Sequence, residues 1–295
     1  MSKVQIIVIR DDGKEFHINT NDSDWRIPSD GLDGFGNYSN SISTVANVVG
    51  DGDIVSNARL GSKDRTIKFI AEDKQDSEAL RNAVTAFFTP KYAFKVYLSY
   101  MGRTRWFEGI IHKFDAPSGN IHKKVTARVT FLGPNPYLKS YDDFGEDIAS
   151  VSGRIAFPYL CSVDNNYPKI IKGITGGVFN FAQEITLNND GDVDTYCRCI
   201  MRAKGEVEDP VLFINGNYVK ILDTLQSGDV IEMDFAAQPP TVKKNGVNFI
   251  GHCDRTSAFD EMILTRGDSR VSFSARNGTN LLQVSIYYNK LYATM

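Results

Sequence analysis

The N-terminal residues alternate between apolar and polar positions in a way that predicts a β-hairpin. Residues 4–9 are apolar and β-branched, and residues 15–19 alternate with period two. Residues 11–14, which contain an Asp-Gly pair, supply the turn between them. Similar runs predict further strands at residues 66–72, 94–101, 104–111 and 125–132.

One segment has the period of an α-helix instead. Its apolar positions recur at i, i+3, i+4 and i+7, namely at Leu80, Ala83, Val84 and Phe87. Asp76 or Ser77 can cap its N-terminus, and Pro90 ends it. The first half of the chain is therefore predicted to be mostly β, with one helix docked on it.

Residues 21–61 lack this regularity. They are rich in Asp, Ser, Asn and Gly, with little periodicity beyond Trp25, Ile27 and residues 43–49. Long irregular segments in compact proteins are usually functional or packed against something else. We therefore expect this segment, as a loop or a long hairpin, to have a function or to pack against something else.

The second half follows a linker at residues 133–137, where two prolines disfavour helix and inner strand. Beyond it, every periodic segment is short and strand-like, separated by Asn-Gly and Gly-Asp turns, which indicates an antiparallel sandwich or jelly roll. Charge changes nearby: residues 1–140 carry 19 Lys and Arg against 16 Asp and Glu, and the remainder has a net charge of −6. The predicted domains are 1–137 and 138–295, in a mainly β protein with one helix.

Composition excludes several classes of protein. The 295 residues are 42% hydrophobic and 23% charged with a net charge of −3, which excludes disorder by composition. Without a basic surplus, a dedicated nucleic-acid binder is disfavoured. No apolar run approaches the ~18 residues of a membrane helix, and we expect no secretion signal. The four cysteines, Cys161, Cys197, Cys199 and Cys253, are then predicted to be reduced, in a chain made in a reducing cytoplasm.

Catalytic motifs are mostly absent. The sequence has no P-loop, no G-x-S-x-G and no H-E-x-x-H. Cys197 and Cys199 share one strand face and could hold zinc with His252 and Cys253, but small buried cysteines are favoured. Residues 188–194 resemble a calcium loop in part, and a polar turn between strands is favoured. We predict no catalytic residue, no metal and no cofactor.

Two alternatives for the second half stay open. Glu232 and Asp234 lie about 7 Å apart on one strand face, a spacing that an inverting glycosidase can use, although a solvated strand face is far commoner. Aromatic residues could stack on sugar rings, and Tyr218 and Tyr288 are the candidate glycan contacts. A place in the hydrophobic core is the competing and favoured interpretation of these tyrosines.

An ordered series of weak motifs resembles the phage distal tail proteins, which join the tube of a long-tailed phage to its tip. The series includes Trp25-Arg26-Ile27, residues 31–35, residues 61–67, Arg105-Trp106-Phe107-Glu108-Gly109 and Asn135-Pro136-Tyr137. In the second half, residues 187–196, 225–231, 246–248 and 284–288 are similar to the galectin-like sandwich of the same family. The family often has Pro at positions 194 and 197, where this chain has Asp and Cys.

The resemblance implies a structural protein rather than an enzyme. It implies a homohexameric ring formed by the first domains, with the tail tube protein and tail-tip proteins as partners. The galectin-like second domain would point outward and hold receptor-binding proteins or touch host glycans. The implied location is the virion tail tip, after assembly in the bacterial cytoplasm. The candidate subunit-interface residues are Trp25, Ile27, Leu32, Phe35 and Trp106.

Overall fold

The computed structural model describes residues 4–47, 50–72, 77–117, 124–141, 144–147, 149–153, 177–181 and 184–295. The chain forms two compact units, each described here by itself. The first unit contains residues 1–142 and 291–295, and the second contains residues 143–290. Predicted residues Asp76 and Cys161 lie outside the described residues.

The first unit is built on one antiparallel sheet. Its main path runs β2-β1-β8-β9-β10-β7-β3, with β4 beside β7, β11 beside β9 and β27 beside β11. The bounds are β1 Gln5–Arg10, β2 Glu15–Ile18, β3 Trp25–Arg26, β4 Leu32–Asp33, β7 Lys63–Ala71, α1 Ser77–Phe87, β8 Ala93–Tyr100, β9 Arg103–Asp115, β10 Thr126–Gly133, β11 Leu138–Ser140 and β27 Leu291–Tyr292. The predicted N-terminal hairpin is present as β1 and β2, and Gly13 in its turn has a φ of +83°.

Alternation along the strands places the core on one face of this sheet. Ile6 and Val8 on β1, Ile67 and Phe69 on β7, and Phe94, Val96 and Leu98 on β8 are fully or almost fully buried. Helix α1 covers this face with Val84 and Phe87. Arg10 donates hydrogen bonds of 3.1 Å to the carbonyls of Ala86 and Phe87, so it satisfies acceptors at the C-terminal end of the helix.

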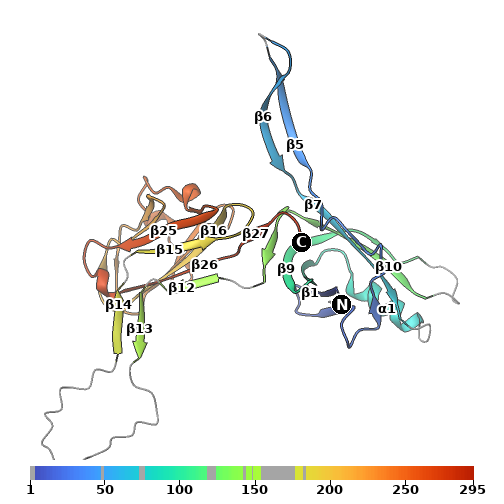
Figure 1. Ribbon diagram of the computed structural model, residues 1–295. Coiled ribbons are helices and arrows are strands. Elements are labelled where there is room, and N and C mark those ends of the chain that lie inside the picture. Colours follow the sequence, from blue (N-terminus) through green and yellow to red (C-terminus); the bar gives the residue numbers. More distant parts are fainter. Residues whose placement is uncertain are drawn as a thin grey trace, which may run out of the picture. The chain divides into compact units, whose positions relative to one another are not determined.

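A long hairpin leaves this sheet where the sequence predicted an irregular segment. It consists of β5 (Asn40–Ala46) and β6 (Asp53–Leu60), paired antiparallel with one bulge. Figure 1 shows it extending away from the sheet of the first unit. Every side chain of β5 and β6 is exposed except that of Leu60, which is half-buried.

The last residues of the chain return to the first unit. Leu138 on β11 lies opposite Tyr292 on β27, and Lys139 lies opposite Leu291. Arg105 stacks its guanidinium 3.7 Å from the Tyr292 ring centre and donates a hydrogen bond to the carbonyl of Thr294. The first unit thus extends to residue 142 and includes residues 291–295, whereas the sequence placed the domain boundary at residue 137. Pairing with the open edge of β9 draws β11 into the first unit.

The second unit is an antiparallel sandwich. One sheet runs β12-β26-β16-β21-β22-β23, with β24 beside β16, and the other runs β15-β25-β18-β19. The bounds are β12 Phe144–Asp147, β13 Ala149–Gly153, β14 Gly177–Phe181, β15 Glu184–Asn189, β16 Thr195–Ala203, β17 Val207–Glu208, β18 Val211–Ile214, β19 Asn217–Lys220, β20 Thr224–Leu225, β21 Val230–Asp234, β22 Thr241–Lys244, β23 Val247–Asn248, β24 Ile263–Leu264, β25 Gly267–Ser274 and β26 Leu282–Tyr288, with 3-10 turns η1 Ile250–His252, η2 Phe259–Glu261 and η3 Thr279–Leu281. Both sheets contribute to one core, through residues such as Met201 and Ile286 from one and Leu212 and Phe273 from the other. The predicted fold class, mainly β with one α-helix in the described chain, is confirmed.

Candidate functional site

Two predicted interface residues lie in the core of the first unit. Trp25 and Phe35 are each only 5% exposed. The Trp25 ring meets Phe69 edge-on at 5.2 Å, and Phe35 lies 6.0 Å from Phe107. Their rings are therefore already occupied within one chain. As candidate subunit-interface residues, they expose almost no side-chain surface in the single chain.

The other three predicted interface residues, Ile27, Leu32 and Trp106, are partly exposed to solvent. Ile27 and Leu32 are half-buried and pack against the core. Trp106 lies half-buried on the opposite face of the sheet, with its indole N–H donating a 2.7 Å hydrogen bond to the Ser140 carbonyl. Its ring stacks on Tyr97 at 5.7 Å, and Lys139 Nζ lies 4.6 Å from the ring centre. Of the five, Trp106 is the one that belongs to an aromatic surface cluster.

The β5–β6 hairpin has the most exposed apolar surface of the first unit's described residues. Ile42, Val45, Ile54 and Val55 are each 58–60% exposed. Ile42 lies opposite Ala58 on one face, and Val45 lies opposite Ile54 on the other face. An isolated two-stranded hairpin is marginally stable in water. A hairpin with apolar side chains on both faces thus has the character of a segment that packs against a partner.

A pocket of about 280 Å³, here called the foot pocket, lies where this hairpin joins the sheet. Its lining is Asn37, Tyr38, Ser39, Leu60, Gly61, Ser62, Lys63, Asp64 and Pro136. Lys63 donates a hydrogen bond to the Asn37 carbonyl, and no carboxylate forms a recorded ion pair with it among the described residues. Burial, followed by the charge of Arg65, lowers the pKa of Lys63. Asp64 pairs instead with His112 at 3.0 Å.

Arg65 lies next to the foot pocket and has no exposed surface. It donates a hydrogen bond to the carbonyl of Pro136, while its Nε and Nη1 have no partner. The Phe107 ring centre is 4.5 Å from the guanidinium carbon. Burial lowers the pKa of Arg65 to about 10, because the charged form loses its hydration. Lys63 and Arg65 therefore form a pair of cations without a recorded anion partner in the described chain.

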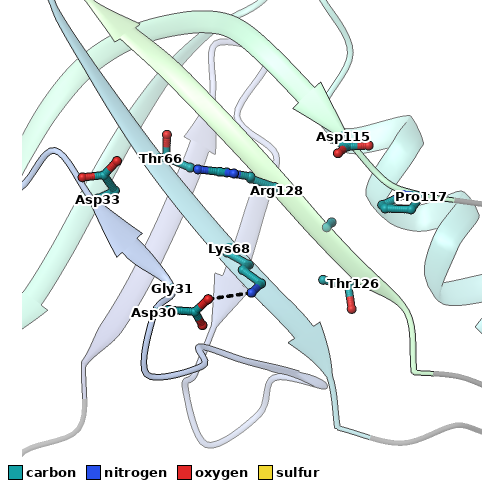
Figure 2. Close-up of a pocket in the computed structure, with 10 residues that line it drawn as sticks. Asp30, Gly31, Asp33, Thr66, Lys68, Asp115, Pro117, Thr126 and Arg128 are labelled. Carbon is teal, nitrogen blue, oxygen red and sulfur yellow. Dashed lines mark hydrogen bonds and ion pairs between the residues drawn. The ribbon is translucent and has the colours of Figure 1, made fainter.

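A second hollow, of about 240 Å³, lies over β4, β7 and β10. Figure 2 shows Lys68 pointing toward Asp30, with which it forms a 2.8 Å ion pair, and Arg128 extending toward Thr66. The hydrogen bond and the charge of Lys68 lower the pKa of Asp30. Three carboxylates and two cations alternate around this hollow, so its charges largely compensate one another. We see a polar sheet face here rather than a reactive centre.

In the second unit, the two predicted glycan contacts separate. Tyr288 is only 6% exposed, and its hydroxyl donates a 3.1 Å hydrogen bond to the Asn188 carbonyl. Position 288 therefore faces the core and leaves little of the Tyr288 ring exposed. Tyr218 is half-buried on the outer face, 6.1 Å from the ring of Phe213 and 2.8 Å from the Thr256 hydroxyl.

At the suspected zinc site, the structure shows buried cysteines. Cys197 and Cys199 lie in the core, and burial raises the pKa of Cys197 to about 12 and that of Cys199 well above its ordinary value. No group of three or more potential metal ligands occurs among the described residues.

In the suspected calcium loop, residues 188–194, side-chain oxygens accept hydrogen bonds from backbone N–H groups of the chain itself. Asn189 Oδ1 accepts the Gly191 N–H at 3.1 Å, and Asp194 Oδ1 accepts the Arg266 N–H at 2.7 Å. These contacts are those of a polar turn between β15 and β16.

The carboxylate pair on β21 also has structural contacts. Glu232 lies 3.9 Å from Arg198, and Asp234 accepts the N–H groups of Ala236 and Ala237. Asp234 therefore shapes the turn that follows its strand. Separately, no described helix has the length and apolar character to cross a membrane.

Comparisons with known proteins agree with this architecture. The family model described as "Siphovirus-type tail component, C-terminal domain" matches residues 190–292. The crystal structure of SPP1 Dit (gp 19.1), described as a paradigm of the hub adsorption apparatus in phages that infect Gram-positive hosts, is similar over 97% of this chain and 98% of its own, with a TM-score of 0.62 and 9% identity. A chain of the phage p2 baseplate in its activated conformation with Sr is similar over the full length of both chains, with a TM-score of 0.57 and 10% identity. No curated protein sequence matches.

The chain thus contains a siphovirus-type tail-component domain, and the fold of both its units is that of phage tail-hub and baseplate proteins. The resemblance predicted from the sequence is confirmed: the chain is similar in fold to a phage distal tail protein, and the matched family model lies within its second unit.

Proposed function

We propose that this chain is the hub subunit that joins the tail tube to the tail-tip or baseplate apparatus. Six copies form a closed ring through their first units. The partners are the tail tube protein on one side and tail-tip proteins on the other. The ring lies at the virion tail tip after assembly in the bacterial cytoplasm. Its role is mechanical, with no catalytic step.

The observation that carries this proposal is the exposed apolar hairpin on a Dit-like fold. Fully burying an Ile or Val side chain is worth about 1.5–3 kcal/mol, so Ile42, Val45 and Ile54 together can supply a large part of an interface. A hairpin that contacts a different surface on the next copy makes a head-to-tail contact, and such contacts close into rings when the rotation suits. Trp106 and its aromatic neighbours provide a second candidate contact surface.

The test is the mass of the full chain in solution. We expect a species of six times 32.9 kDa, and ring-shaped particles by electron microscopy. The triple variant Ile42→Thr, Val45→Thr, Ile54→Thr keeps β-branched side chains but removes apolar surface, and it should shift the chain to monomers. Val247→Thr is the matched control, because Val247 is 69% exposed in the second unit. A strict monomer at high concentration would contradict the proposal.

A carbohydrate-binding role for the second unit is the alternative function. The Phe213–Tyr218 pair on the outer face of the four-stranded sheet favours it, because aromatic faces stack on pyranose rings. A glycan array probed with the full chain tests this role. Binding that Tyr218→Ala removes and Tyr196→Ala leaves intact would support it, since Tyr196 lies on the other sheet. An array without any bound glycan would remove it.

A further inference from the structure

The foot pocket has an unbalanced positive charge. Lys63 lines the pocket, and the buried Arg65 donates a hydrogen bond to the carbonyl of Pro136, another lining residue. Asp64 also lines the pocket and contacts His112 at 3.0 Å, and its single negative charge leaves one positive charge of Lys63 and Arg65 in excess. Removing cations from water is costly unless an anion or a set of acceptors replaces the lost hydration. The pocket therefore has the chemistry of a carboxylate-binding site.

The same hairpin carries the opposite charge at its far end. Asp51 and Asp53 are exposed at the tip, and neither has a recorded ion pair in the described chain. Asp53 accepts a 3.4 Å hydrogen bond from the Thr44 hydroxyl. The hairpin thus has an acidic tip and a basic foot.

Geometry prevents one copy from joining these two ends. Strand β6 runs eight residues from Asp53 to Leu60. At about 3.3 Å per residue it separates tip from foot by roughly 25 Å. Figure 1 shows the tip and the foot at opposite ends of the extended hairpin. A tip carboxylate can therefore reach only the foot pocket of another copy.

We propose that the foot pocket binds the carboxylate of Asp51 or Asp53 from the hairpin tip of a neighbouring copy, with Lys63 as the contacting cation. The positive charge of the buried Arg65 adds to the attraction for this carboxylate. The hairpin tip of each copy contacts the foot pocket of the next copy. The contact is therefore head-to-tail and can continue around a ring. This inference rests on the ring assembly proposed above and names the polar contact within it.

Carbodiimide crosslinking tests the contact directly, because it joins a carboxylate and an amine only where they form a close pair. A mixture of ¹⁵N-labelled and unlabelled full-length chains is assembled, crosslinked and digested. We expect peptides that join Lys63 to Asp51 or Asp53 and carry one label state on each side. Lys63→Arg keeps the charge but cannot form the amide, so rings should persist while the crosslink disappears.

Charge exchange provides the second measurement. Lys63→Asp and the double variant Asp51→Lys, Asp53→Lys should each weaken assembly at least about tenfold, and the combined triple variant should recover most of the loss. Lys14→Asp, at an exposed turn, is the control and should have little effect. Rings that form without the mixed-label crosslink, or that tolerate Lys63→Asp, would overturn this inference alone. A wild-type chain that never assembles would overturn the ring proposal as well.

Discussion

The buried guanidinium of Arg65 leads to a prediction that contradicts the usual expectation for a buried charge. Removing one member of a buried ion pair typically costs about 3–5 kcal/mol, because the other charge is left unpaired. Arg65 has no recorded carboxylate partner to leave behind. We therefore expect Arg65→Met to change the free energy of unfolding by less than about 1 kcal/mol.

The magnitude follows from opposing contributions. Burial lowers the pKa of Arg65 from 12.5 to about 10. At about 1.4 kcal/mol per pKa unit, the buried charge costs roughly 3 kcal/mol. Because the folded pKa lies below the unfolded pKa, this cost is present throughout neutral pH and lessens only above about pH 10. Methionine removes the cost but also removes the contact with Phe107, worth about 1 kcal/mol. The hydrogen bond to Pro136, worth about 1.5–3 kcal/mol, is lost too, so the sum is close to zero.

Tryptophan fluorescence is suited to this measurement. Both tryptophans of the chain, Trp25 and Trp106, belong to the first unit, so denaturant unfolding followed by fluorescence reports on that unit. Arg105→Met is the matched control. Arg105 holds Tyr292 and Thr294 in the same unit, and its loss should cost about 1–3 kcal/mol.

A loss of more than about 3 kcal/mol in Arg65→Met would refute this reasoning. Such a loss would mean that an anion pairs with Arg65 inside the free chain. It would also remove the argument that the foot pocket needs an external carboxylate.

Three further predictions concern other parts of the chain. Deleting residues 291–295 removes a strand together with the Tyr292 ring and the Thr294 carbonyl that Arg105 contacts, so the fluorescence transition of the first unit should move to lower denaturant. Asp12→Asn should flatten the pH dependence of stability between about pH 4 and pH 2: the bond to Arg10 lowers the pKa of Asp12 to about 2, so its stabilisation is complete above the unfolded pKa and lost as pH falls through that window. At pH 8, mass spectrometry of the native chain after thiol labelling should find Cys253 modified slowly and the two buried thiols of β16 unmodified, because burial raises all three pKa values. Labelling of β16 thiols as fast as in denatured protein would contradict the last prediction.

The pattern of apolar positions predicted those strands and helices in which buried and exposed side chains alternate regularly. The β1–β2 hairpin and helix α1 were found because a core face leaves a period of two or 3.6 in the sequence. For residues 21–61 the sequence predicted only a loop or a long hairpin, without the strands of the β5–β6 hairpin. Both of its faces are exposed, so no apolar alternation marks it as a strand pair.

The site residues depended on information that one sequence does not carry. Trp25 and Phe35 stand in an irregular segment, where no period tells whether an aromatic ring faces its own core or a partner. The foot pocket joins residues 37–39 to residues 60–64 and to Pro136, so its charge imbalance becomes visible only after folding. The pairing of β27 with β11 spans more than 150 positions and leaves no local pattern.

That pairing of β11 with β27 makes the whole sandwich an insert in a β-hairpin. The chain leaves the first unit after β11 and re-enters it in the antiparallel neighbour, so the two junctions are adjacent positions in one ladder. A short turn between Ser140 and Leu291 would close the first unit without the sandwich. The same junction could accept a different folded module whose termini lie close together. Evolution and protein engineering can therefore exchange the inserted module while the first unit keeps its own strand order.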